Sequence, residues 1–317
     1  MNSAVPDVKI FVVAETTARL DCFLRRQYPS VSTNQWRLAL KAGDILVDGR
    51  PGAKGDTLAV GQKVSIPTST LSRLTALHPE PETGVKLDIV YQDDDLLALN
   101  KPAHCHTHPL SVSETGTLAN YLIADFPELA GVGGFGPLQP GLLNRLDFAT
   151  SGIVLVARND LTWERVRQQF TQHLIRKEYV ALVQGLIAES MVIDKTLTHA
   201  AGDRRRMVIT PPAPHCRGIY PARTEVLPMF YSSIRDITLV RLVMYSGVMH
   251  QLRVHLAAVG HPLAGDPLYD GMESVTVAAD ISPTDSQIDF YLHCLRLSLP
   301  DGREIATPAV EWCTGFN

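Results

Sequence analysis

The stretch GIVLVA at Gly152–Ala157 constrains the fold more than any other part of the sequence. A continuous apolar run of this length, entered through the polar segment NRLDFATSG, is typical of a buried strand. Further strand-like runs surround it without a regular βαβ alternation, at Leu87–Val90, Leu96–Leu99, Glu178–Val183, Thr224–Phe230 and Ile237–Tyr245. We therefore predict an α+β domain built on a mixed, largely antiparallel sheet with flanking helices.

The first 70 residues have the pattern of a separate small module. Thr17 is placed to cap a first helix and Ser32 to cap a second, which ends at Gly43. Short strands are expected at Ile45–Val47 and Lys63–Ile66. Two short helices and a small sheet make a module of about 55 residues, which is near the lower limit for independent folding.

The chain length of 317 residues suggests roughly two domains. The segment that follows the module is rich in Ser, Thr, Pro and Glu, as expected of a linker. We therefore divide the chain into a module at residues 1–70, a linker at 71–84 and a larger domain at 85–317.

The formal net charge of −4 argues against a protein that coats nucleic acid nonspecifically. Positive charge is local instead. Residues 11–66 carry eight Lys or Arg against five Asp or Glu, and Arg204, Arg205 and Arg206 stand in a row. Taken alone, the arginine run indicates a solvated loop.

Several protein classes find no support in the sequence. Five scattered cysteines fit a reducing cytoplasm better than a disulfide framework, and no apolar run approaches the roughly 18 residues that span a membrane. Neither a P-loop nor a classical dinucleotide-binding site is supported, so we expect no nucleotide cofactor. The histidines at His104, His106 and His108 with Cys105 are too tightly spaced for common zinc patterns, so we expect no metal.

Three segments carry residues suited to chemistry. NRLDFATSG places Asp147 on a loop at a sheet edge, where an ionised carboxylate could act as nucleophile or base, although such an Asp is more often a turn residue. SGVMHQLRVH puts His250 and Arg253 on one helical face, where the guanidinium could hold a carboxylate. RKEYVALVQG opens a strand with Tyr179, a position that is usually core.

These segments occur together and in a fixed order: NKPAHCHTHP, NRLDFATSGIVLVAR, RKEYVALVQG, HQLRVHLAAVGHPLAGDPLY and LHCLRL. The set resembles the RluA family of pseudouridine synthases over roughly Val85–Leu299. RLDxxTSG followed by HQ(I/L)RVHLA is highly specific for that family. The resemblance implies an isomerase that converts uridine to pseudouridine in RNA, a reaction without a redox step and therefore without a cofactor.

The resemblance also assigns residue roles. Asp147 matches the catalytic aspartate that attacks the target nucleotide, and Arg253 matches the basic residue that pairs with it. Tyr179 matches the tyrosine that stacks on the uracil and serves in proton transfer. Leu252 matches a residue lining the pocket, and Arg145 matches the arginine that fills the gap left by the extruded base.

This chain departs from the family pattern at two places. Asn144 stands where the family usually has His, and Gly247-Val248 stands where Gly-Arg is usual. Asn144 can still form hydrogen bonds and is kept, with His250, as a substrate-binding candidate, whereas Val248 cannot contact a phosphate. Activity is expected, because the aspartate, the tyrosine and the arginine are all present.

The N-terminal module resembles the alpha-L RNA-binding domain, the type named after the fourth ribosomal small-subunit protein. The resemblance is carried by Arg19-Leu20-Asp21, Lys41-Ala42-Gly43-Asp44 and Val47-Asp48-Gly49. It implies that Arg19 and Lys41 contact RNA, and Arg204, Arg205 and Arg206 are further RNA-binding candidates. Ser32-Thr33 replaces the usual Ser-Arg, which removes one phosphate contact.

The expected partner is structured RNA, with large-subunit (23S) ribosomal RNA favoured and transfer RNA as the alternative. A catalytically silent RNA-binding or ribosome-assembly factor is a second hypothesis, supported by Asn144 and Val248. An Asp-nucleophile glycosidase is a third, but it needs a second carboxylate, and Asp266 and Asp270 are interpreted as loop residues. We expect a monomer in the cytoplasm.

Overall fold

The computed structural model describes residues 7–14, 17–28, 31, 33–75, 78–133, 135–210, 218–269 and 291–314. The chain divides into two compact units. The first comprises Met1–Val85, His108–Leu142 and Ala157–Trp163, and the second comprises Lys86–Thr107, Leu143–Val156 and Glu164–Asn317. The units therefore divide the chain differently from the three consecutive segments that we expected. Ser32, Cys216 and Asp270 lie outside the described residues.

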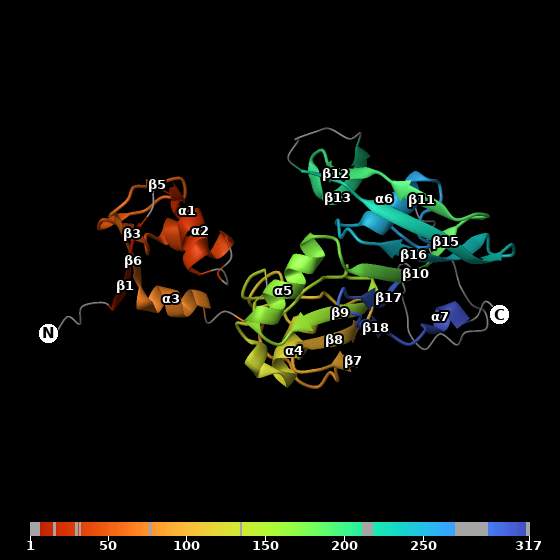
Figure 1. Ribbon diagram of the computed structural model, residues 1–317, viewed down its shortest axis with the longest axis horizontal. Helices are drawn as coiled ribbons and strands as arrows, with labels where there is room; N and C mark the ends of the chain where they lie inside the picture. The colour runs from red at the N-terminus through yellow and green to blue at the C-terminus, as the bar shows by residue number, and fades with distance from the viewer. Residues whose placement is uncertain are drawn as a thin grey trace. The chain divides into compact units, whose positions relative to one another are not determined.

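The N-terminal module is a small sheet packed on short helices (Figure 1). Its four-stranded sheet has the order β1-β6-β3-β4, and β2 pairs with β5. The helices bury Leu20, Leu24 and Trp36 against Ile45. The element bounds are β1 Val8–Val12, β2 Thr17–Arg19, α1 Leu20–Gln27, α2 Thr33–Ala42, β3 Leu46–Val47, β4 Arg50–Pro51, β5 Thr57–Leu58, β6 Lys63–Pro67 and α3 Thr68–Thr75.

Both predicted helices of the module are confirmed, and α2 ends before Gly43, which has a left-handed φ of 76°. The start of α1 differs from the prediction. Thr17 belongs to strand β2, and Arg19 is the N-cap residue. Threonine often caps a helix, but here Thr17 pairs with Leu58 of β5 instead.

The segment that we expected to be a linker is partly ordered. Its start is helix α3, which buries Leu71 and Leu74 in the core of the module. The segment also contacts Asn120, whose Nδ2 donates to the carbonyl of Glu80 and whose carbonyl accepts the N–H of Glu82. The polar composition of the segment led us to overlook two leucines at helical spacing and the hydrogen bonds of its backbone to Asn120.

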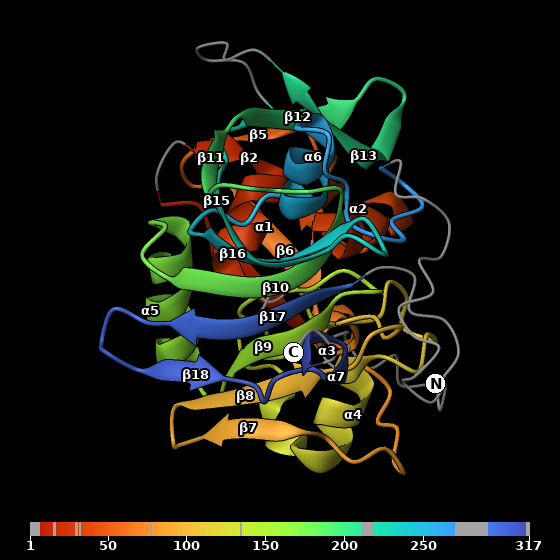
Figure 2. The ribbon, with the colours of Figure 1, turned by 90° about the vertical axis from the view of Figure 1, so that its right-hand side faces the viewer.

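The second unit contains the large sheet, which has nine strands among the described residues. Along the sheet the order is β11-β15-β16-β10-β17-β9-β8-β7, with β18 paired to β17, and Figure 2 shows β10, β17, β9, β8 and β7 side by side. The bounds are β7 Ile89–Gln92, β8 Leu96–Lys101, β9 Ser151–Ala157, β10 Arg176–Gln184, β11 Met191–Asp194, β15 Arg223–Ser232, β16 Ile237–Met244, β17 Leu292–Ser298 and β18 Glu304–Ala306.

The predicted fold class is confirmed. Strand β10 is antiparallel to β16 and β17, and β15 is antiparallel to β11 and β16, whereas β9 runs parallel to β17. The run Ile153–Ala157 within β9 is fully buried, as its continuous apolar sequence predicted. Helices complete the α+β fold: α4 Leu118–Asp125, the 3-10 turn η1 Pro127–Leu129, α5 Asp160–Thr171, α6 Gln251–Ala258 and α7 Glu311–Thr314.

A second, three-stranded sheet has the order β13-β12-β14, with β12 Thr196–Ala200, β13 Asp203–Thr210 and β14 Ile219–Tyr220. The arginine run Arg204–Arg206, which we expected to be a loop, lies in β13. The loop prediction was wrong because β13 pairs with β12 on both sides of the run, Asp203 with Ala200 and Met207 with His199, and the run lies in the irregularity between these two pairs. Within the described part of the chain, no helix is long and apolar enough to cross a membrane.

Candidate active site

The loop that carries Asp147 is fixed to the strand that follows it. The carbonyl of Asp147 accepts the N–H of Thr150, which closes a turn. The Asn144 side chain accepts the N–H of Leu155 at 2.7 Å and donates to the carbonyl of Ile153 at 3.1 Å. We expected Asn144 to bind substrate, but the structure uses its carboxamide to hold the loop against β9.

The glycine of the TSG sequence after the loop is required for a steric reason. Gly152 has a φ of +112°, and a Cβ placed there would lie 2.3 Å from the carbonyl oxygen of Cys294. These two residues are also partners in the parallel pairing of β9 with β17. Only glycine allows this close approach, so the start of β9 is fixed against the sheet.

A second set of bonds fixes the residues on either side of Asp147. The Thr107 hydroxyl donates to the carbonyl of Leu146 and accepts its N–H. Lys101 is fully buried, and its Nζ donates to the carbonyl of Phe148 at 3.3 Å and to that of Cys105 at 2.7 Å. Burial lowers the pKa of Lys101 to about 8, although the charge of Asp147 opposes that change. The backbone is thus held while the Asp147 side chain stays 34% exposed.

Arg253, on helix α6, divides its guanidinium between two carboxylates. Its Nε and Nη2 each donate to Asp266 at 2.7 Å, and its Nη1 donates to Oδ2 of Asp147 at 3.3 Å. Arg253 is 7% exposed and Asp266 is 0% exposed. Burial lowers the pKa of Arg253, but the hydrogen bonds and charge of Asp266 outweigh burial and leave that pKa raised. The guanidinium is therefore a fixed cation beside Asp147.

Sequence reasoning missed Asp266, which we took for a loop residue. A usable signal was present, because Arg253 stands among the apolar residues Leu252, Val254 and Leu256. A cation on such a helix needs a buried carboxylate, and the rigid loop that follows α6 contains Asp266. Leu252 itself is buried, in keeping with the expected lining role.

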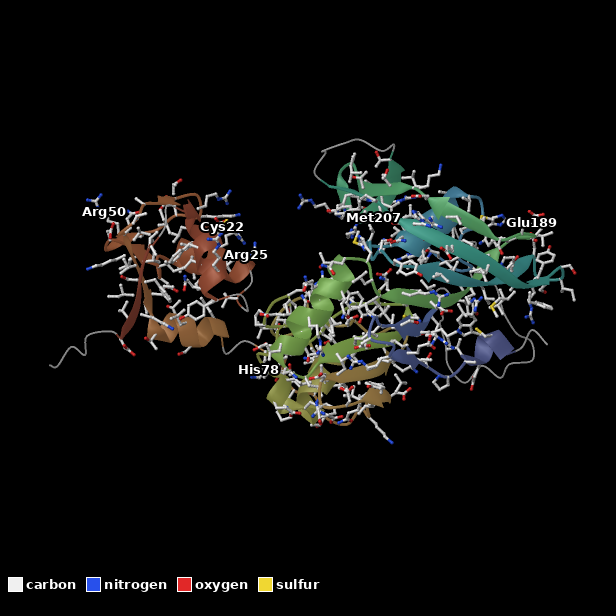
Figure 3. The ribbon with its side chains drawn as sticks, viewed as in Figure 1. Cys22, Arg25, Arg50, His78, Glu189 and Met207 are labelled. Carbon is white, nitrogen blue, oxygen red and sulfur yellow. The ribbon has the colours of Figure 1, made fainter. Side chains whose placement is uncertain are left out.

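His250 is the N-cap residue of α6, in a left-handed conformation with a φ of 54°. Its Nδ1 lies 2.9 Å from the hydroxyl of Tyr269, and its Nε2 lies 3.7 Å from Oδ2 of Asp147. Tyr269 also accepts the N–H of Met207, which is labelled in Figure 3, so its own proton is available for His250. Burial lowers the pKa of His250, against the opposing charge of Asp147. The geometry favours a neutral imidazole with its proton on Nε2, toward the carboxylate.

Tyr179 lies on β10 and pairs across the sheet with Cys294 of β17. Burial raises the pKa of Tyr179 well above its usual value, and the neighbouring Cys294 acts in the same direction. Asp147 acts on Tyr179 in the same direction through its charge. The phenol is therefore protonated at neutral pH, as a stacking ring or proton donor requires.

The other predicted contact residues are spread over both units. Arg145 is exposed, and its charge lowers the pKa of Arg167 after the larger effect of burial. Arg206 lies 5.5 Å from the Tyr269 ring, whereas Arg204 and Arg205 are exposed. The structure thus brings Arg206 to the site, while Arg204 and Arg205 remain candidates on the exposed part of β13.

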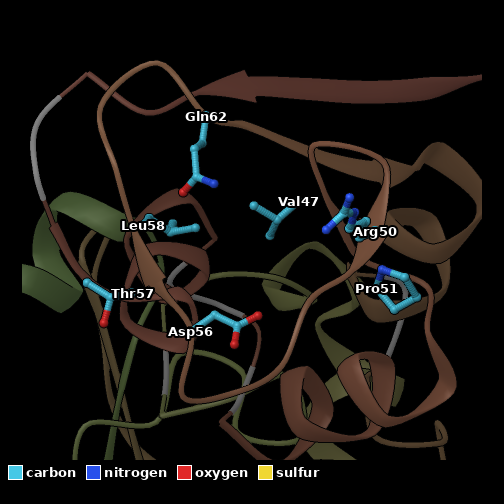
Figure 4. A pocket seen from close by; sticks show the side chains of 7 residues that line it. All are labelled: Val47, Arg50, Pro51, Asp56, Thr57, Leu58 and Gln62. Atoms are coloured by element: carbon cyan, nitrogen blue, oxygen red, sulfur yellow. The ribbon is translucent and has the colours of Figure 1, made fainter.

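In the N-terminal module the exposed Arg19 forms an ion pair with the buried Asp21, with Nη2 and Oδ2 2.7 Å apart. Lys41 is exposed, as are Arg25 and Arg50, which are labelled in Figure 3. A depression of about 320 Å³ on this module is lined by Val47, Arg50, Pro51, Asp56, Thr57, Leu58 and Gln62 (Figure 4). Its lining is mixed in polarity and contains no predicted site residue.

Comparison with known proteins identifies the class. The family described as RNA pseudouridylate synthase matches residues 95–258. The chain is 32% identical over 262 residues to the uncharacterized RNA pseudouridine synthase YlyB of Bacillus subtilis, covering 82% of each chain. It is 30% identical over 262 residues to the ribosomal large subunit pseudouridine synthase D of Xanthomonas campestris, covering 82% of this chain and 74% of the relative.

A solved structure agrees. The human RNA pseudouridylate synthase domain containing 1 is 27% identical, with a TM-score of 0.54 over 72% of this chain and 86% of that chain. With the fold, these matches define an enzyme of the isomerase class. More narrowly, the chain belongs to the RNA pseudouridine synthase family, which confirms the prediction from the motifs. The family match lies outside residues 1–70, so the alpha-L resemblance of the module stays a prediction.

Proposed function

We propose that this enzyme isomerises specific uridines in structured RNA, with Asp147 as the nucleophile. One observation carries the assignment: the Asp147 carboxylate is 34% exposed and lies 3.3 Å from a guanidinium that is itself buried. A carboxylate held at a fixed position beside a buried cation, yet open to solvent, suits attack on a bound nucleotide. A glycosidase would need a second catalytic carboxylate beside Asp147. Asp266, the other carboxylate bonded to Arg253, is fully buried and cannot reach a substrate, which disfavours the glycosidase hypothesis.

The reaction balances without an external reagent. Asp147 attacks C1′ of the ribose, and uracil leaves through N1 with the electron pair of the broken bond. The base then turns, and its C5 attacks C1′ and displaces the carboxylate, which regenerates Asp147. C5 then loses its proton and N1 gains one. In this proposal Arg253 fixes Asp147, Tyr179 stacks on the uracil and takes part in the proton transfer, and Leu252 closes the apolar side of the pocket.

The target base must leave its stack to reach Asp147, at a cost of a few kcal/mol. Arg145, which is exposed two residues before Asp147, is placed to occupy the gap. The favoured substrate is large-subunit ribosomal RNA, because the Xanthomonas relative is named for that RNA. The exposed Lys41 and the other basic residues of the N-terminal module support RNA contacts there. The proposal includes a monomeric enzyme of the cytoplasm, consistent with thiols that form no disulfide at Cys22, Cys294 and Cys313.

Tritium release from RNA labelled at C5 of uridine tests the proposal. Asp147→Asn should abolish release and leave RNA affinity nearly unchanged, because the substitution removes the nucleophile and little of the surface. Asp236→Asn is a matched control, since Asp236 is exposed and has a positive φ that asparagine also adopts. Retained release in the Asp147 variant would refute the assignment. Absence of release from wild type with ribosomal and transfer RNA alike would favour the silent RNA-binding factor.

A further inference from the structure

Phe148, the residue after Asp147, has an aromatic side chain that is 43% exposed. Two imidazole rings lie against it. The His106 ring centroid is 4.8 Å away with an interplanar angle of 44°, and the His104 centroid is 5.5 Å away with an angle of 81°. We propose that Phe148, flanked by His104 and His106, is a stacking site for the RNA base next to the target uridine. This inference rests on the proposed function.

The ring is exposed but held in place. The carbonyl of Phe148 accepts the N–H of Cys105 at 3.2 Å and a bond from Nζ of the buried Lys101 at 3.3 Å. His104 adopts a left-handed φ of 57°, which turns the chain sharply just before Cys105. The loop that carries both histidines is therefore tied to the Asp147 loop. A stacking surface fixed before the ligand arrives loses little conformational entropy on binding.

The geometry favours a planar ligand. Neither imidazole is parallel to the Phe148 ring, since the angles are 44° and 81°, so neither completes an offset stack. A nucleobase has the flat aromatic face that can, and stacking on Phe or His is a common way to hold an unstacked RNA base. A purine would cover more of the ring than a pyrimidine.

Position in the chain identifies which base. The Cα atoms of consecutive residues are about 3.8 Å apart, so a base on Phe148 belongs to a nucleotide close to the one that Asp147 attacks. The site thus reads the immediate neighbour of the target, and it contributes to the choice of uridine as well as to affinity. In the sequence this surface comes from HCHTHP and from the first variable position of RLDxxTSG.

Kinetics with the full-length enzyme test the site. Phe148→Leu should raise KM for tritium release from labelled large-subunit ribosomal RNA by roughly 5- to 100-fold, the range expected for one lost base stack. The effect on kcat should be smaller, and Phe148→Trp should restore KM. Phe230→Leu is the control, because Phe230 is 44% exposed on β15 of the same unit. The melting temperature should stay unchanged in all three variants.

A binding measurement keeps the inference independent of catalysis. Single-stranded RNA oligonucleotides carrying 2-aminopurine on either side of one uridine are titrated with the Asp147→Asn enzyme. Quenching of the probe on one side, lost when Phe148→Leu is added, supports the stacking site even if no tritium is released. Equal KM and equal quenching in the Phe148→Leu and parent enzymes would overturn it. Equal losses in the Leu and Trp variants, with a lowered melting temperature, would also overturn it and assign the ring to the fold.

Discussion

The Arg253–Asp266 pair should dominate the stability of the active site. Asp266 is 0% exposed and accepts two hydrogen bonds of 2.7 Å from Arg253. Asp266→Asn keeps the volume but leaves the guanidinium in a buried place without its counter-charge. Breaking a buried pair on one side costs about 3–5 kcal/mol, so we expect the free energy of unfolding to fall by that amount.

The second carboxylate on the same guanidinium should behave differently. Asp147 is partly exposed and contributes one bond of 3.3 Å, so Asp147→Asn should cost less than about 1 kcal/mol. From the sequence we expected Arg253 to pair with Asp147. In the structure the buried partner of Arg253 is Asp266, so the larger loss of stability is expected at Asp266.

A double-mutant cycle measures the pair. Arg253→Met alone should cost about as much as Asp266→Asn, because each leaves one buried charge. The double variant should cost much less than the sum, since neither charge remains. Urea unfolding followed by circular dichroism gives the values, provided the slope with denaturant is the same for each variant. A loss below about 1 kcal/mol for Asp266→Asn, or additive single effects, would refute the buried pair.

Three further predictions concern the module, the sheet and acid stability. Deleting residues 1–75, which includes all of α3, should weaken RNA binding and reduce the slope of log affinity against log salt by roughly 0.7 per lost phosphate contact; identical isotherms would refute a role in RNA binding. Gly152→Ala should destabilise the protein by more than about 1 kcal/mol, because its Cβ would meet the backbone of Cys294; an unchanged melting temperature would contradict that approach. Burial lowers the pKa of His293 to about 4, so the fold keeps it neutral while the unfolded chain binds a proton below about pH 6.5. Stability should therefore be full above pH 6.5 and fall by up to about 3 kcal/mol toward pH 4, a loss that His293→Gln should reduce and that urea unfolding at each pH would reveal.

Local patterns predicted much of the fold. The apolar run of β9 and the capping glycine after α2 could be read directly, because each depends on neighbours within a few residues. Helix α3 and strand β13 could not. Leu71 and Leu74 join a core made by other segments, and β13 forms because residues on both sides of its arginine run pair with β12. Composition alone suggested a linker and a loop, and tertiary contacts decided otherwise.

The sequence predicted the central residues of the candidate site but not the residues that hold them in place. Asp147, Arg253 and His250 came from motif spacing and lie together, with 3.3 Å and 3.7 Å between the side chains and the shared Oδ2. Lys101 holds the Asp147 loop from a distant part of the chain, so no short pattern reveals it. Asp266 could be found only by asking which carboxylate a buried Arg253 needs. The amide of Asn144 bonds the backbone of β9, a contact that the motif did not indicate.

The forked guanidinium of Arg253 sets a limit on what evolution or an engineer can place at that position. Three of its nitrogens serve two acids at once, and an ammonium with a single nitrogen cannot reproduce that fork. A lysine at this position could bond Asp266 or Asp147 but could not form all three of these hydrogen bonds. Arg253 should therefore tolerate substitution poorly, although in the proposed reaction it forms no covalent bond to the substrate.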